Sequence, residues 1–134
     1  MKKIGTVCIV DDDDIYQFTV KYEIEQTQLV DHIKFFSDGE QAIHFLEKVF
    51  DQPSQLPDIV FLDINMPIMD GWGFLEEFAQ LKPKLGKKIT VYMVSSSNNE
   101  KDIERAKQIN EVTDYIIKPV TRDMLIPLFK KFVA

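Results

Sequence analysis

The chain has 134 residues, of which 45% are hydrophobic and 28% charged, so its length suits one globular domain with a real core and leaves little for a second. The formal net charge of −6 argues against direct nucleic-acid binding, because that recognition depends on clustered Lys and Arg. The single cysteine, Cys8, excludes a disulfide framework, and no apolar stretch is long enough for a membrane span, so we expect a cytoplasmic protein.

Five short apolar runs, rich in β-branched residues, predict five strands at residues 4–10, 32–36, 59–62, 89–94 and 115–117. Helical patterns fill the gaps between them. The apolar residues that repeat at helical spacing are Ala42, Ile43, Leu46, Val49 and Phe50, then Phe74, Leu75, Phe78 and Leu81, and finally Met124, Leu125, Leu128, Phe129 and Phe132. The pattern of the first helix, through Ile15, Phe18, Tyr22 and Leu29, is less regular. Strands that are apolar on both faces and alternate with helices predict an α/β fold, a doubly wound parallel (βα)₅ sheet.

Turn residues mark several helix ends. Ser37-Asp38-Gly39 and Asp70-Gly71 predict the starts of the second and third helices, and Ser97-Asn98-Asn99-Glu100 resembles an N-cap with its capping-box glutamate. Pro127 falls inside the last helical pattern, where it removes a backbone donor, so we expect that helix to be kinked or to start late.

Polar residues follow four of the predicted strands. The first strand passes into Asp11 and Asp12, the third ends in Asp63, the fourth in Ser95 and the fifth in Lys118. Because the carboxyl ends of parallel strands meet at one edge of a sheet, we expect three carboxylates, a hydroxyl and an ammonium to share one cleft.

This set of groups favours phosphoryl chemistry with a metal ion. Clustered carboxylates repel one another unless a cation joins them, and oxygen ligands without His or Cys select a hard ion such as Mg²⁺. Asp63 would be the nucleophile that forms an aspartyl phosphate, Asp11 and Asp12 would hold the metal, and Lys118 and Ser95 would bond the phosphoryl oxygens.

Each of these residues also has an ordinary structural alternative. The run from Asp11 to Asp14 can simply cap a helix, Asp63 can be a turn aspartate, Ser95 a loop serine and Lys118 a surface lysine. It is the four strand ends together that favour a functional site.

The sequence resembles the receiver domain of bacterial two-component response regulators over essentially the whole chain, residues 1–134. The matching segments are Val10-Asp11-Asp12, Leu62-Asp63-Ile64-Asn65-Met66-Pro67 with Met69-Asp70-Gly71, Val94-Ser95-Ser96, and Tyr115-Ile116-Ile117-Lys118-Pro119. The resemblance implies a flavodoxin-like sheet with strand order 2-1-3-4-5.

The resemblance also assigns roles in the metal site. It implies that Asp63 is the phosphoacceptor and a ligand of Mg²⁺, that Asp12 is a direct ligand, and that Asp11 is a ligand through water. The backbone carbonyl of Asn65 is implied as a further ligand.

Two residues are implied as the moving parts of a switch. Ser95 is the switch hydroxyl, and Tyr115 matches the aromatic residue whose ring turns inward when Ser95 moves toward the phosphoryl group. Lys118-Pro119 is a candidate for a cis peptide bond. Ser96 departs from the family pattern, which usually has a smaller residue there, so the lifetime of the acyl phosphate is open.

The resemblance implies partners as well. The phosphoryl donor would be a histidine kinase or a histidine phosphotransfer protein. With no output domain expected after the fifth helix, output would pass to a separate protein or through phosphorylation-dependent homodimerisation. Such a protein is not a conventional enzyme, although it catalyses its own phosphorylation and dephosphorylation.

Three other classes of protein compete with this one. A receiver-like interaction module that is never phosphorylated would usually lack the Asp or the Lys. A metal-dependent phosphohydrolase needs a second aspartate where Asn65 stands, and a flavin-binding protein needs a phosphate cradle where the chain has Asp11 to Asp14.

Overall fold

Strands and helices alternate along the chain in the computed structural model, which describes residues 2–133. The strands are β1 (Ile4–Val10), β2 (Val30–Phe36), β3 (Ile59–Leu62), β4 (Thr90–Ser95) and β5 (Val112–Ile117). The helices are α1 (Asp14–Thr27), α2 (Gly39–Lys48), α3 (Gly71–Leu81), α4 (Glu100–Lys107) and α5 (Arg122–Val133), with a short 3-10 helix, η1 (Lys82–Lys84), after α3. All neighbouring strands pair in parallel in the order β2-β1-β3-β4-β5, which confirms the predicted fold class and strand order.

The predicted bounds are accurate for the central strands and less so for the two strands at the sheet edges. β1 and β3 have the predicted limits, whereas β2 begins at Val30 and β5 at Val112, both earlier than predicted. Exposed polar residues interrupt the apolar pattern of the edge strands, as at Asp31 in β2 and Asp114 in β5. An edge strand has a neighbour on one side only, so its pattern is less apolar than that of a central strand.

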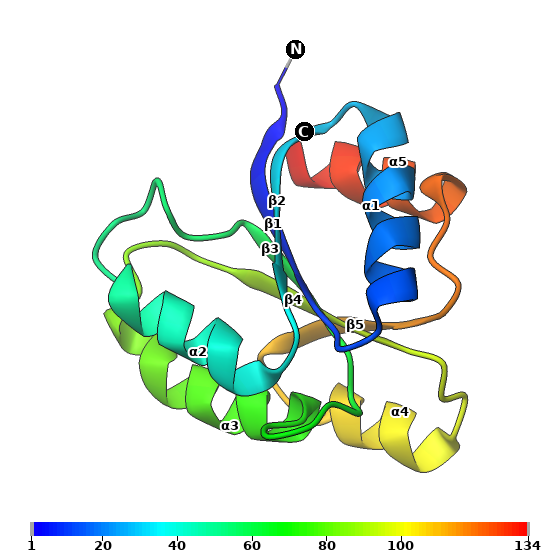
Figure 1. The fold of residues 1–134 in the computed structure, drawn as a ribbon. Coiled ribbons are helices and arrows are strands. Elements are labelled where there is room, and N and C mark those ends of the chain that lie inside the picture. The colour runs from blue at the N-terminus through cyan, green and yellow to red at the C-terminus, as the bar shows by residue number, and fades with distance from the viewer. Residues whose placement is uncertain (1, 134) are drawn as a thin grey trace.

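The sheet is covered on both faces, which divides the core into two clusters (Figure 1). Helices α2 and α3 and Ala106 of α4 pack on one face, and α1 and α5 on the other. Within residues 2–133 no helix combines the length and the apolar character that crossing a bilayer requires.

Helix α1 presents a different face to the sheet from the one that its sequence pattern predicts. Val20 and Ile24 are buried, whereas Ile15, Phe18 and Tyr22 are 80%, 76% and 51% exposed. The predicted apolar face of this helix is therefore wrong. Apolar residues alternate with polar ones along much of α1, so the pattern fits more than one helical face, and packing on the sheet selects between them.

Three helix starts test the turn predictions. Asp38 and Asp70 are the N-caps of α2 and α3, as predicted, and each side chain accepts a backbone N–H bond from the first turn. The N-cap of α4 is Asn99, not Ser97, so the predicted capping box is wrong. The Ser97 hydroxyl instead donates to Asp102 Oδ2 at 2.9 Å.

Helix α5 does not start late, contrary to one of the two outcomes predicted from Pro127. It begins at Arg122 and continues through Pro127. Pro127 cannot donate to the carbonyl of Asp123, one turn earlier, but both residues are exposed, so water can satisfy that carbonyl.

Candidate functional site

Backbone hydrogen bonds hold the carboxyl ends of the strands in register at one edge of the sheet. The N–H of Asp11 donates to the carbonyl of the last residue of β2, and the N–H of Asp63 donates to that of the last residue of β1, both at 2.9 Å. The N–H of Lys118 donates to the carbonyl of Ser95, also at 2.9 Å. The four strand ends that the sequence pointed to therefore meet, as predicted from parallel pairing.

Three aspartates converge at this edge. One carboxylate oxygen from each of Asp11, Asp12 and Asp63 lies within 4.8 Å of the others. Asp11 is 1% exposed and Asp63 9% exposed, whereas Asp12 faces solvent. Next in sequence, Asp13 caps α1 and accepts hydrogen bonds from the N–H groups of its first turn, so the run of aspartates serves both the site and the helix start.

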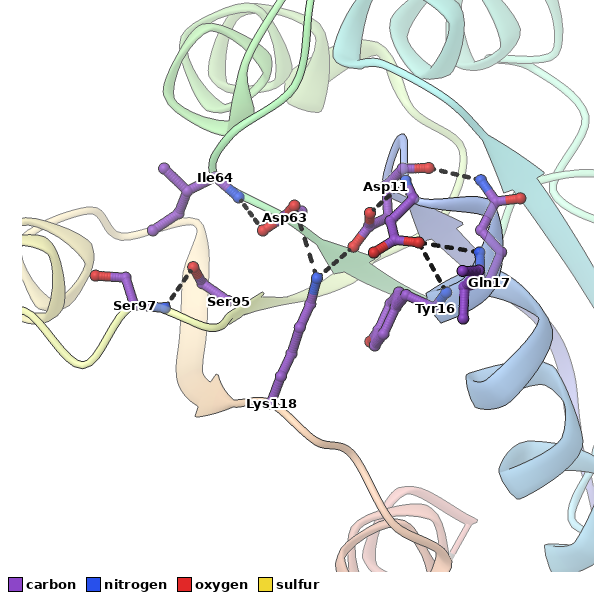
Figure 2. A network of polar contacts seen from close by, with 10 residues as sticks. Asp11, Tyr16, Gln17, Asp63, Ile64, Ser95, Ser97 and Lys118 are labelled. Atoms are coloured by element: carbon purple, nitrogen blue, oxygen red, sulfur yellow. Dashed lines mark hydrogen bonds and ion pairs between the residues drawn. The ribbon is translucent and has the colours of Figure 1, made fainter.

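Lys118 brings the positive charge to the same place (Figure 2). Its Nζ lies 2.8 Å from Asp11 Oδ2 and 3.8 Å from Asp63 Oδ2. The same nitrogen lies 4.0 Å from the centroid of the Tyr16 ring. The Lys118-Pro119 peptide bond is cis, as predicted.

The electrostatics of the site are dominated by burial and like charge. Burial first, and then the nearby Asp11, raise the pKa of Asp63 from its ordinary 3.8 to about 6. Lys118 and a hydrogen bond of 2.8 Å from the N–H of Ile64 to Asp63 Oδ1 act in the opposite direction. Three carboxylates and one ammonium leave a net negative charge, and the donor set consists of oxygen atoms, which fits a hard divalent cation such as Mg²⁺.

The loop after β3 folds back closely against Asp63. The N–H of Gly71 donates to the Ile64 carbonyl at 2.8 Å, and a Cβ at Gly71 would lie 2.4 Å from the Asp63 carbonyl oxygen. Only glycine fits this approach. Ile68, at the tip of the loop, has a φ of 68° and is 77% exposed. The role of the Asn65 carbonyl as a metal ligand remains a prediction.

The two predicted switch residues are both bonded to Ser97. Ser95 is buried, and its Oγ accepts the N–H of Ser97 at 3.1 Å. The Tyr115 hydroxyl donates to the Ser97 carbonyl at 2.8 Å, while its ring packs against the core cluster under α2 and α3. Ser97 therefore connects Ser95 and Tyr115, the two residues that the family resemblance implies as a switch. Its own sequence context predicts only a helix cap.

Sequence reasoning also missed Tyr16 and Gln17. The Gln17 Nε2 donates to the Asp11 carbonyl at 2.6 Å, and the Tyr16 ring contacts the Lys118 ammonium. The sequence did contain a signal for Tyr16, because it lies four residues before Val20 and so on the same, buried face of α1.

The strand order and the position of the acidic cluster define a class of protein, the doubly wound α/β proteins with a site beyond the carboxyl ends of the central strands. The family model for the response regulator receiver domain matches residues 7–130. The chain therefore belongs to the receiver domain family of two-component response regulators.

Individual relatives agree with this assignment. A two-component response regulator from Cytophaga hutchinsonii has a solved structure with a TM-score of 0.87 and 33% identity, over 97% of each chain. The CheX-CheY-BeF3-Mg²⁺ complex from Borrelia burgdorferi matches with a TM-score of 0.75 and 26% identity, over 97% of this chain and 90% of that one. The nitrate/nitrite response regulator protein NarL of Escherichia coli is 30% identical over 97% of this chain, which spans 55% of the length of NarL.

Proposed function

We propose that the chain is the phosphoacceptor switch of a two-component phosphorelay, in which Asp63 receives a phosphoryl group from a histidine kinase or a histidine phosphotransfer protein. The observation that supports this most directly is the Lys118 ammonium, 2.8 Å from Asp11 and 3.8 Å from Asp63, in a site otherwise made of carboxylates. A cation beside a carboxylate nucleophile is what transfer of a negatively charged phosphoryl group requires.

The transfer exchanges one bond to phosphorus for another. An Asp63 carboxylate oxygen forms the new bond to phosphorus as the bond to the nitrogen of the donor histidine breaks, which leaves an aspartyl phosphate and a free imidazole. With a pKa of about 6, Asp63 is mostly ionised at neutral pH and so is available as the nucleophile. Lys118 and Ser95 are the proposed partners of the phosphoryl oxygens.

Asp11, Asp12, Asp63 and the Asn65 carbonyl are the groups proposed to hold Mg²⁺. When bound, the ion offsets the negative charge that the phosphoryl group adds to an already acidic site. The CheX-CheY-BeF3-Mg²⁺ complex from Borrelia burgdorferi supports this for a protein of the same fold.

The proposed output begins at Ser95. A Ser95 hydroxyl that turns toward the phosphoryl group loses its present bond with the N–H of Ser97, whose carbonyl holds Tyr115. The loop before α4 and the Tyr115 ring would then respond together, which changes the surface offered to a separate protein or to a second copy of the chain. We propose that this takes place in the cytoplasm.

Phosphorylation by a small phosphodonor tests the proposal. Incubation with Mg²⁺ and acetyl phosphate should add the mass of one phosphoryl group to the wild type, and nothing to Asp63→Asn or Asp12→Ala. Asp14→Asn is the matched control, because Asp14 is exposed in the same acidic run but outside the cluster, and should be labelled like the wild type.

Two outcomes would contradict parts of this proposal. A folded wild type that gains no mass would favour a receiver-like interaction module that is never phosphorylated. Undiminished labelling of Asp12→Ala would show that the assigned metal ligands are wrong.

A further inference from the structure

Lys118 has a third neighbour besides the two aspartates. Its Nζ lies 4.0 Å from the centroid of the Tyr16 ring, well inside the roughly 6 Å range of a cation–π contact (Figure 2). The Lys118 side chain is only 17% exposed, so water screens this contact weakly. Cation–π attraction is stronger when the pair is partly desolvated.

The ring is fixed, whereas the lysine is flexible. Tyr16 lies in the first turn of α1, where its N–H donates to the capping Asp13 at 3.1 Å. Its ring packs against the core cluster between the sheet, α1 and α5. Lys118 has a long unbranched side chain with many rotamers, which costs free energy to hold in one place.

The hydroxyl of Tyr16 does not explain why this position is aromatic. Tyr16 Oη is buried and has no hydrogen-bond partner among the described residues. Burial, Asp11 and Asp63 raise the pKa of this hydroxyl, so Tyr16 stays neutral. What Tyr16 offers to the site is therefore the face of its ring.

We propose that Tyr16 is a positioning residue for Lys118, holding the ammonium beside Asp63 by a cation–π contact during phosphoryl transfer. This inference rests on the proposed role of Asp63 as phosphoacceptor. A neutral ring attracts the ammonium without adding the negative charge by which another carboxylate would repel the phosphoryl group. It also remains a partner for Lys118 when the charge of Asp11 is shared with a metal ion.

Substitutions at Tyr16 distinguish the effect of the aromatic ring from the effect of side-chain size. Tyr16→Leu should slow phosphorylation by acetyl phosphate roughly 3- to 10-fold, while Tyr16→Phe should keep the wild-type rate. Phe18→Leu is the matched control, because Phe18 is an aromatic residue of the same helix that is 76% exposed, and its rate should not change. In the Lys118→Met background, Tyr16→Leu should cause no further loss.

The dependence of the phosphorylation rate on the electron density of the ring distinguishes a cation–π contact from a purely structural role of Tyr16. Replacing Tyr16 by phenylalanines with increasing numbers of ring fluorines keeps the shape and weakens the negative face, so the rate should fall stepwise with each fluorine. In NMR spectra of the resting protein, the side-chain protons next to the Lys118 ammonium should be shifted upfield by the ring in the wild type and Tyr16→Phe, and not in Tyr16→Leu.

The outcomes distinguish this inference from the proposed function. Phosphorylation rates that do not change with fluorination of the ring would overturn the positioning role, and so would Lys118 resonances that stay unchanged in a folded Tyr16→Leu variant. Either result would leave Asp63 as the proposed acceptor. A wild type that takes up no phosphoryl group would overturn the function and, with it, the role of the contact in transfer. The loss of the upfield shift in Tyr16→Leu, together with the fluorine dependence, would establish the role.

Discussion

The charge of Asp63 should destabilise the metal-free protein at neutral pH, and Asp63→Asn should remove this cost. The folded protein has a pKa of about 6 at Asp63, against an ordinary 3.8. Because the folded state binds this proton more tightly than the unfolded state, stability falls as pH rises through this window and stays lower at pH 7. A shift of about two pKa units corresponds to about 3 kcal/mol, and relaxation of the site and water penetration around the charge reduce the expected effect to about 1 to 2 kcal/mol.

The prediction can be measured by thermal unfolding in EDTA, followed by circular dichroism. At pH 7, Asp63→Asn should unfold roughly 3 to 8 °C above the wild type, and the difference should shrink toward pH 4, where the folded wild type is protonated. Mg²⁺ should stabilise the wild type more than the variant, because the variant lacks one proposed ligand. Asp14→Asn, which changes an exposed carboxylate, is the control.

Asp63→Asn would refute the reasoning if it unfolded at or below the wild-type temperature in EDTA. A difference that did not depend on pH would also refute it, since the cost would then not come from the ionised carboxylate.

Three further predictions concern backbone positions. Gly71→Ala should destabilise the protein by about 1 to 3 kcal/mol and impair labelling, because its Cβ would lie 2.4 Å from the Asp63 carbonyl oxygen; an unchanged urea midpoint would contradict this. Ile68→Asn should stabilise by about 1 kcal/mol, because asparagine tolerates the φ of 68° better than a β-branched residue, whereas Ile68→Val should bring no gain in the same titration. Pro127→Ala should stabilise by about 1 to 2 kcal/mol by restoring a helical hydrogen bond, and a lower urea midpoint would show that Pro127 does not weaken α5.

The fold was predictable because its information is local and repeated. Each central strand is a short apolar run, and the alternation with helices leaves parallel pairing as the simple arrangement. The errors occur where tertiary packing decides. In α1 the apolar residues fit more than one face, so the pattern predicts Ile15 and Phe18 on the inner face although they are exposed.

The site was predictable for the residues that end strands. Asp11, Asp63 and Lys118 come together because the sheet aligns its carboxyl ends, which needs no knowledge of side-chain contacts. The contributions of Tyr16 and Ser97 were not predictable in this way. They depend on the rotation of α1 about its axis and on the path of one loop, which no strand-end rule describes.

The way in which Ser97 joins its neighbours has a consequence for how much sequence change the protein can accept. Its links to Ser95 and Tyr115 are made by the backbone N–H and carbonyl, which every residue except proline provides in full, whereas its link to Asp102 of α4 is made by the hydroxyl. Substitution at position 97 can therefore loosen α4 while leaving intact the connection between the buried serine and the tyrosine. In the proposed switch, the response of Ser95 and Tyr115 to phosphorylation and the mobility of α4 can therefore change independently of one another when residue 97 changes.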